Sequence, residues 1–297
     1  MALYAFDGTG NEDKDGDTKD SNVLWFFRGY DDPLKNDDPK KDRGSLYLKG
    51  IGTRAREFLG KTIGEAFGFG GHKRIRQALD RMEHNFDAGD EIIDVVGFSR
   101  GAALAISFAN EIAGKYANRA VRFIGVWDIV GEFGLPGEHV NAGHNLHFPP
   151  NVERCYHAMA LDEHRVLFQL TRLTAGGLHE KDRLQEVWFR GVHSDVGGGN
   201  GNLGLNWIAL NWIFANALRQ GLPINMEAVA LNLKHEDRPQ LISEKPEVGP
   251  PRVIRNTDLL HSSVRLEPGA QIKTHNNPPA NLARIDDEGT ITVAASV

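Results

Sequence analysis

The sequence has a single cysteine, Cys155, among its 297 residues. One thiol excludes an intrachain disulfide and any zinc site built from several thiolates. No segment approaches the roughly 18 consecutive apolar residues that a transmembrane helix requires. Positive charge is not in excess either, since 34 Lys and Arg stand against 40 Asp and Glu, a formal net charge of −6. Because nucleic-acid binding needs clustered cations to neutralise phosphates, we expect no nucleic-acid partner.

The N-terminal residues, Met1 to Asp7, lack the basic start and long apolar run of a secretory signal peptide. We therefore expect synthesis in the cytoplasm, with any export by a route that needs no cleavable signal. The composition, 40% hydrophobic and 25% charged residues, is typical of a globular chain that buries a sizeable core.

Short apolar segments alternate with helical patterns over the first 221 residues. The sequence predicts strands at 2–6, 91–98, 121–127 and 184–192, and helices at 72–86, 100–115, 155–169 and 203–219. This alternation is typical of an α/β fold, a mostly parallel sheet with helices on both faces. We expect one domain over residues 1–221, with a surface excursion over 12–71. Residues 222–297 are expected to wrap or extend the same domain.

Part of the excursion is rich in glycine. Seven glycines occur between Gly50 and Gly71. We expect them to prevent a stable helix there, because an interior glycine costs up to about 1 kcal/mol relative to alanine. Phe67 and Phe69 lie among these glycines and still require cover. Two interpretations satisfy both features, a flap over an apolar site with these phenylalanines as its lid, or an ordinary packed loop.

The most specific motif is Gly97-Phe98-Ser99-Arg100-Gly101, a G-x-S-x-G between a predicted strand and a predicted alanine-rich helix. A serine on such a tight turn exposes its hydroxyl above the sheet, and the flanking glycines avoid collisions with neighbouring backbone. The motif therefore predicts that Ser99 is a nucleophile. The alternative is a serine that only caps the following helix.

A nucleophilic serine needs a base, and the base needs an acid to orient it. Asp128 directly follows the strand predicted at 121–127, and His193 follows the one at 184–192. Carboxyl ends of parallel strands meet at one edge, so we expect Ser99, Asp128 and His193 to converge there, in the chain order of an α/β-hydrolase. Asp195 is the alternative acid, or else a residue that orients the loop or caps the next turn.

The first predicted strand ends at Asp7-Gly8-Thr9-Gly10. If this strand lies beside the nucleophile strand, the backbone amides of Gly8 and Thr9, with that of Arg100, form an oxyanion hole. The sequence does not separate Gly8 from Thr9 as the donor. The alternative is a plain turn in which the Asp7 side chain bonds its own loop.

Five motifs occur in a fixed order along the chain: FDGTGN at 6–11, GFSRGA at 97–102, GVWD at 125–128, HAMALDEH at 157–164 and VWFRGVHSDVGGG at 187–199. The set resembles the α/β-hydrolase domain of the type VI secretion lipase effectors (Tle family), over residues 3 to about 221. The resemblance implies a metal-independent phospholipase or related carboxylester hydrolase, with Ser99 as nucleophile, Asp128 as acid and His193 as base.

The resemblance also has implications for partners. It implies a lipid or small-ester substrate, contact with a membrane surface, export through a type VI system, and a secretion-apparatus or immunity protein as partner.

One acidic segment resembles a metal site. Asp13, Asp15 and Asp17 begin like a calcium-binding loop, but Thr18 stands where an EF-hand requires glycine and Leu24 where it requires glutamate. A solvated acidic loop is therefore the favoured interpretation, with calcium as the alternative. No other metal and no cofactor are expected.

The placement of Ser99, Asp128 and His193 predicts a serine carboxylester hydrolase that works through an acyl-enzyme. The resemblance implies that it is of the phospholipase type and acts as an antibacterial secreted effector. Two alternatives remain at this point. One is an esterase that acts on a soluble, non-lipid ester. The other is a hydrolase-fold adaptor without catalysis, because a fold does not guarantee its chemistry.

Overall fold

A computed structural model describes the chain except for residues 10, 12–17, 52–62, 117, 132–143, 174–181, 245–248, 265–275 and 294–297, and over 63–69 it describes the backbone alone. The strands are β1 (Ala2–Phe6), β2 (Leu46–Leu48), β3 (Ile93–Phe98), β4 (Val121–Trp127), β5 (Val152–Ala160), β6 (Leu184–Phe189), β7 (Leu259–His261), β8 (Arg284–Ile285) and β9 (Ile291–Thr292). They form one sheet of order β2-β1-β3-β4-β5-β6-β7-β8-β9. Every neighbouring pair runs parallel except β8 and β9.

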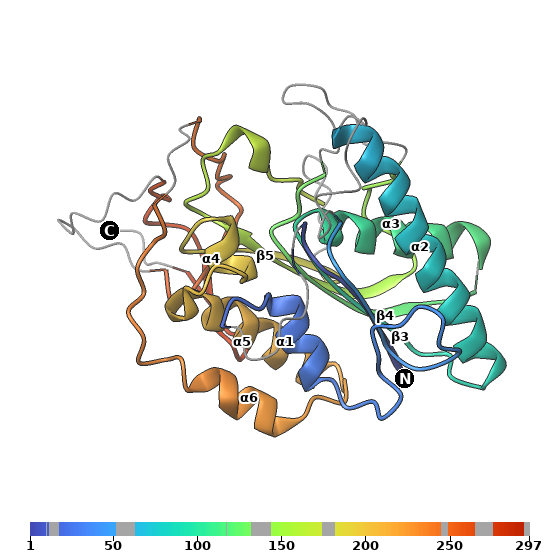
Figure 1. Ribbon diagram of the computed structural model, residues 1–297. Helices are drawn as coiled ribbons and strands as arrows, with labels where there is room; N and C mark the ends of the chain where they lie inside the picture. Colours follow the sequence, from blue (N-terminus) through green and yellow to red (C-terminus); the bar gives the residue numbers. More distant parts are fainter. Residues whose placement is uncertain are drawn as a thin grey trace.

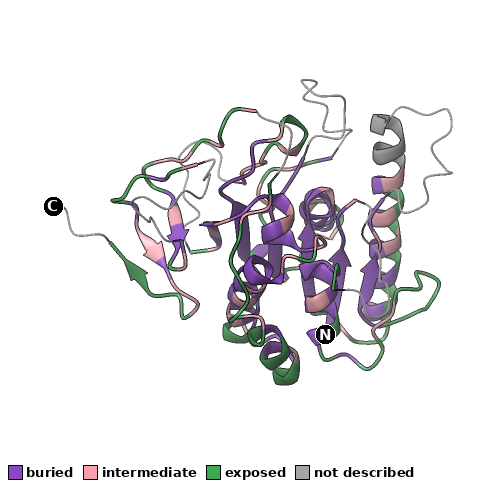
Figure 2. Ribbon diagram, turned by 60° about the vertical axis from the view of Figure 1, so that its left-hand side comes forward, coloured by how far each residue is buried: buried purple, intermediate pink, exposed green. Residues whose placement is uncertain are grey.

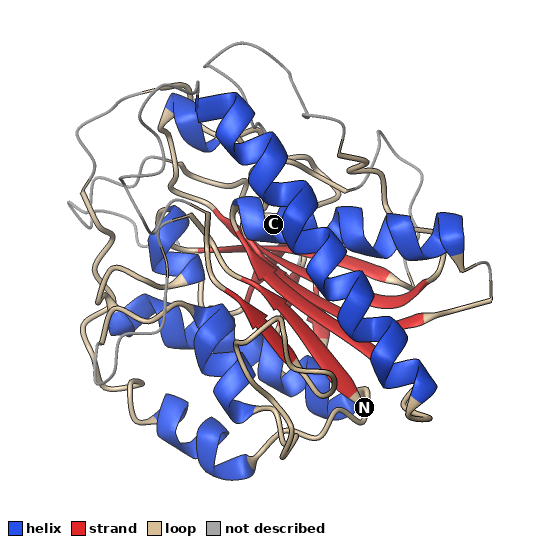
Figure 3. Cartoon of the chain, turned by 45° about the vertical axis from the view of Figure 1, so that its right-hand side comes forward, coloured by secondary structure: helices blue, strands red, loops and turns tan. Residues whose placement is uncertain are grey.

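Helices cover both faces of the sheet (Figures 1 and 3). One face carries α2 (Ile63–Asp87) and α3 (Arg100–Lys115). The other carries α1 (Asn22–Gly29), α4 (His193–Gly197), α5 (Leu203–Arg219) and α6 (Met226–Leu233), and a short 3₁₀ helix, η2 (Val166–Phe168), follows β5. The prediction of an α/β fold with a mostly parallel, doubly covered sheet is confirmed.

Alternating side chains divide the core into two layers. In β1, Tyr4 and Phe6 point toward α3, whereas Leu3 and Ala5 point toward the layer of α1 and α5. This alternation is the period-two pattern of a strand that is buried on both faces. Figure 2 shows the burial concentrated in the central strands and their neighbouring helices.

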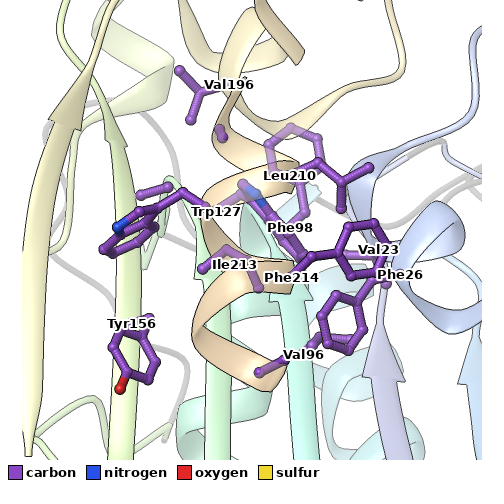
Figure 4. Packing of buried hydrophobic residues seen from close by; sticks show 14 of the residues in the cluster. Val23, Phe26, Val96, Phe98, Trp127, Tyr156, Val196, Leu210, Ile213 and Phe214 are labelled. Atoms are coloured by element: carbon purple, nitrogen blue, oxygen red, sulfur yellow. The ribbon is translucent and has the colours of Figure 1, made fainter. Parts of the chain in front are cut away.

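The layer under α5 is aromatic. Phe26 of α1 stacks on Phe214 of α5 with ring centroids 5.1 Å apart, and it meets Trp127 of β4 edge-on at 6.3 Å (Figure 4). Full burial of a large apolar side chain contributes about 1.5–3 kcal/mol to folding. These contacts fix the end of β4, the strand that leads directly into Asp128.

The prediction of a helix over 155–169 is wrong. Residues 152–160 form β5, which lies between β4 and β6 with its last six residues buried. Its buried part, residues 155–160, shows no apolar–polar alternation because both faces are covered, so its period does not distinguish it from a buried helix.

The expectation that glycine prevents a helix before residue 72 is also wrong, because α2 begins at Ile63. A Cβ atom on Gly71 would lie 2.9 Å from both Nε2 of His144 and Cδ2 of Leu104. Gly71 thus permits close packing against α3, and this packing offsets the low helix propensity of glycine. Residues 52–62 and the side chains of Phe67 and Phe69 lie outside the described residues, so the lid remains a prediction.

The excursion over 12–71 is not confined to the surface. It supplies β2, which pairs with β1, and α1, whose apolar residues are largely buried. The last part of the chain adds β7 beside β6, with Val187 opposite Leu259. Within the described residues, no helix is long and apolar enough to cross a membrane.

Candidate active site

Ser99 lies on the sharp turn between β3 and α3. Its backbone has φ 58° and ψ −128°, a strained conformation for a residue other than glycine. A Cβ on Gly97 would lie 2.7 Å from Cα of Ala102, and one on Gly101 would lie 2.3 Å from the carbonyl oxygen of Phe6. A side chain at either glycine would collide with backbone. The Ser99 side chain makes no capping hydrogen bond to α3, so the helix-cap alternative is not supported.

The structure brings the three predicted side chains together at the carboxyl edge of the sheet. Nε2 of His193 lies 2.8 Å from Oγ of Ser99, and Nδ1 lies 2.6 Å from Oδ2 of Asp128. Asp128 follows β4 on a turn with φ 44°, and its Oδ1 accepts a hydrogen bond from the Ala160 amide at 2.8 Å. The convergence expected from the ends of three parallel strands is therefore observed.

Burial sets the protonation of this series. Ser99, Asp128 and His193 are 3%, 0% and 4% exposed. Burial lowers the pKa of His193, although the hydrogen bond to Asp128 opposes this effect. Burial alone would raise the pKa of Asp128, but the charge of Arg252 and the bond to His193 outweigh it and hold that pKa well below its usual range. At neutral pH the imidazole is therefore neutral and the carboxylate ionised. In that state Nδ1–H donates to Asp128 and Nε2 accepts from the Ser99 hydroxyl.

The imidazole of His193 is enclosed and anchored. The rings of Phe98 and Phe168 lie 4.6 and 4.7 Å from it, centroid to centroid. The backbone N–H of His193 donates to Oε2 of Glu163 at 3.0 Å. Glu163 is buried, which would raise its pKa, but hydrogen bonds from Arg165 lower that pKa to about 2. An ionised carboxylate thus fixes the start of α4.

Asp195 lies on α4 but its carboxylate bonds elsewhere. It accepts from the Val192 amide at 3.1 Å and from Oγ of Ser243 at 2.5 Å. Its Oδ1 also accepts from the side-chain amides of Asn200 and Asn202. These bonds cap α4 and tie the following loop, as the other interpretation of Asp195 expected, while His193 uses Asp128.

The loop after β1 lies beside the serine turn, because β1 pairs with β3. Asp7 is buried, which raises its pKa, and its carboxylate accepts from the Gly8 amide at 2.6 Å, from Oγ of Ser21 at 2.6 Å and from the Tyr47 hydroxyl at 2.5 Å. The Gly8 amide is thus committed to Asp7. Of the two donors that the sequence left open, Gly8 therefore already has a hydrogen-bond partner.

Arg252 is a part of the site that sequence reasoning missed. Its guanidinium binds both carboxylate oxygens of Asp128, with Nη1 2.5 Å from Oδ1 and Nη2 2.9 Å from Oδ2. The two residues are 124 positions apart. No spacing or local motif marks the arginine, so only a three-dimensional arrangement identifies it.

A pocket of about 340 Å³ is lined in part by Arg252 and by Phe168, whose ring lies against that of His193, but Ser99 and His193 do not line it. Across the part of the chain that the structure describes, no group of three or more histidine, cysteine or acidic side chains is arranged to hold a metal ion. The acidic residues Asp13, Asp15 and Asp17 lie outside that part, so the calcium alternative there is not addressed.

Two solved structures align with the chain, and the first of them supports the fold. An uncharacterized protein from Pseudomonas aeruginosa aligns with a TM-score of 0.54 and 21% identity, over 77% of this chain and 47% of its own. The Tle1 effector bound to the VgrG spike of the type VI secretion system aligns with a TM-score of 0.46 and 21% identity, over 67% of this chain and 50% of its own. The chain spans about half the length of each.

No curated protein matches the sequence. The family described as the catalytic domain of Tle1-like phospholipase effectors of type VI secretion matches residues 3–114 and 109–216, which together make up most of the chain. The match includes the serine turn, Asp128 and His193. The chain therefore belongs to the family of Tle1-like catalytic domains of type VI secretion phospholipase effectors.

Proposed function

We propose that the chain is a serine carboxylester hydrolase that cleaves phospholipid esters through an acyl-enzyme. The observation that supports this most strongly is the hydrogen-bonded series from Ser99 to His193 to Asp128, at 2.8 and 2.6 Å. Membership of the Tle1-like family suggests the substrate class. The proposed roles are nucleophile for Ser99, general base for His193 and orienting acid for Asp128.

In the first step, Oγ of Ser99 attacks the acyl carbonyl carbon while its proton passes to Nε2 of His193. Asp128 holds the tautomer in which Nε2 is free to accept that proton, and it stabilises the imidazolium that forms. The carbonyl π electrons move to oxygen and give a tetrahedral oxyanion. Collapse of this intermediate breaks the ester C–O bond, and His193 returns the proton to the departing alcohol.

In the second step, water attacks the acyl-enzyme. His193 takes one proton from the water as the new C–O bond forms, and it returns that proton to Oγ of Ser99 as the acyl–enzyme bond breaks. The fatty acid leaves, and the site returns to its starting protonation. The same imidazole thus serves as base and acid in turn.

The developing oxyanion requires donors beside Ser99. We assign this role to the backbone amides of Thr9 and Arg100. Arg100 opens α3 directly after the serine, and a Cβ on Gly101 would lie 2.4 Å from the carbonyl oxygen of Asp7, so the first turn of α3 touches the loop of Thr9. The Thr9 hydroxyl is buried without a hydrogen-bond partner in the described structure. One such donor contributes about 3 kcal/mol to lowering the barrier.

Delivery through a type VI apparatus into a rival cell, contact with its membrane surface, and binding of a secretion-apparatus or immunity protein belong to the same proposal. They rest on the family description. The Tle1 effector in the solved complex is bound to the VgrG spike. Co-purification of the chain with spike proteins from the same bacterium would test this part independently of catalysis.

Catalysis is tested with purified protein on p-nitrophenyl esters of short acids and on phospholipid vesicles. We expect hydrolysis of both, and loss of both in Ser99→Ala with an unchanged melting temperature. Turnover that persists in Ser99→Ala would remove the proposal. Hydrolysis of soluble esters without release of fatty acid from vesicles would replace phospholipid by a soluble ester, and absence of any turnover would favour the adaptor.

A further inference from the structure

Each oxygen of the Asp128 carboxylate accepts two hydrogen bonds. Oδ1 accepts from the Ala160 amide at 2.8 Å and from Nη1 of Arg252 at 2.5 Å. Oδ2 accepts from Nδ1 of His193 at 2.6 Å and from Nη2 of Arg252 at 2.9 Å. A bidentate pair of this kind fixes the plane of the carboxylate as well as its position, and charge-assisted bonds are among the strongest in proteins.

Arg252 is itself held by the fold. Its side chain is 7% exposed, and its two terminal nitrogens also donate to the carbonyl oxygens of Ala160 and Phe168, each at 2.7 Å. The side-chain amide of Asn276 donates to the backbone carbonyl oxygen of Arg252 at 2.8 Å. Pro250 and Pro251 precede it in the sequence and restrict the chain there. The guanidinium therefore brings a fixed geometry to Asp128.

We propose that Arg252, from the C-terminal segment, is a positioning residue for the catalytic series. It holds the Asp128 carboxylate so that Oδ2 faces His193, and it places a positive charge beside the His193–Asp128 pair. The proposal rests on the proposed function in that His193 is taken as the base. Arg252 lies beyond residue 216, where the family match ends. The C-terminal segment therefore completes a site whose other members all lie within the match.

The two effects of Arg252 are separable, because its bidentate guanidinium orients Asp128 and its positive charge acts on His193. Burial lowers the pKa of His193, Asp128 and Glu163 raise it, and Arg252 lowers it further. Several elements bring titratable or charged groups around His193. They are Asp128 after β4, His157 on β5, Glu163 after β5 with its partner Arg165, Asp195 on α4, and Arg252 of the C-terminal segment. Of these groups, Arg252 is the cation that donates hydrogen bonds to Asp128, the partner of His193.

The test compares two variants. Arg252→Gln removes both the positive charge and the bidentate guanidinium, whereas Arg252→Lys keeps the charge and loses the bidentate geometry. The readouts are kcat/KM on a soluble ester as a function of pH and the titration of the His193 imidazole by NMR, assigned with His193→Gln. In Arg252→Gln we expect the titration midpoint and the acid limb of the rate profile to move to higher pH. At the plateau we expect a loss of about ten- to a hundredfold.

In Arg252→Lys we expect a similar loss of rate with the titration midpoint near that of the wild type. Arg238→Gln, at an exposed arginine of the same C-terminal segment, is the control for charge alone and should leave rate and titration unchanged. A wild-type rate in Arg252→Lys, or a His193 titration unmoved in Arg252→Gln, would overturn the proposal.

The two readouts also separate this proposal from the proposed function. If the wild type hydrolysed no ester, the function would fail while the NMR titration still decided the role of Arg252. If Arg252→Gln did not fold, as judged from its melting curve, the rate and titration of Arg252→Lys would decide.

Discussion

The backbone N–H of His193 donates to Oε2 of Glu163 at 3.0 Å. The carboxylate belongs to the segment that leaves β5, and Arg165 holds it ionised through Nη2 at 2.7 Å. The histidine is thus anchored through its main chain by one acidic residue and through its ring by another, Asp128. The two carboxylates lie on segments that follow neighbouring strands of one sheet, β4 and β5.

Replacing Glu163 by glutamine keeps the acceptor and removes a negative charge beside His193. Because that charge raises the pKa of the imidazole, we expect the acid limb of the rate profile to move to lower pH, the direction opposite to that in Arg252→Gln. A profile of kcat/KM against pH for the purified variant checks this. An acid limb that stays in place or moves to higher pH would show that the Glu163 charge does not raise the pKa of His193.

The wild-type profile itself has a predicted position. Burial depresses the pKa of His193 below its ordinary value of 6.5, and a group with a depressed pKa keeps its basic form as the pH falls. Activity should therefore persist below pH 6.5 and decline only at more acidic values, as the imidazole takes a proton. Measurement of kcat/KM on a soluble ester from pH 4 to pH 8 tests this. A midpoint above 6.5 would contradict the described environment of the ring.

The turn that carries Ser99 depends on Gly101. In Gly101→Ala the new Cβ would lie 2.3 Å from the carbonyl oxygen of Phe6, so backbone must move. We expect a loss of about 1–3 kcal/mol in the free energy of unfolding, and about 2–4 °C in melting temperature per kcal/mol. Gly114 lies on the same helix, and a Cβ atom there would have no neighbouring atom within 4 Å, so Gly114→Ala should be neutral or stabilising. Equal melting temperatures for the two variants would contradict this packing.

The two candidate acids are distinguished by matched substitutions. Asp128→Asn should lower kcat by about 10³–10⁴, because the amide no longer fixes the reactive tautomer of His193. Asp195→Asn should mainly lower the melting temperature, because its carboxylate bonds Val192 and Ser243 and not the imidazole. Active-site titration of each variant corrects for unfolded protein. A larger loss of kcat in Asp195→Asn would reverse the assignment.

Much of the fold was predictable because local patterns were strong. The apolar strand at 121–127 and the helices at 100–115 and 203–219 have the bounds that the sequence predicted. The convergence of Ser99, Asp128 and His193 followed from their places after three parallel strands. Beyond local pattern, that inference used only the rule that such strand ends share one edge.

Other parts depend on tertiary contacts that a sequence does not record. The strand over 152–160 has no alternation because both of its faces are buried. The strands β7, β8 and β9 contain two or three residues each, too few to display a period. Arg252 reaches Asp128 across 124 residues, and only the folded chain reveals that pairing.

The central claim is that the Oγ atom of one serine is activated by His193. Treatment with a fluorophosphonate probe, followed by peptide mass spectrometry, tests it most directly. The account predicts a single labelled residue, Ser99, with labelling lost in Ser99→Ala and strongly slowed in His193→Ala, while both variants keep the wild-type melting temperature within a few degrees. Labelling at another residue, or labelling of Ser99 at the same rate without His193, would contradict it.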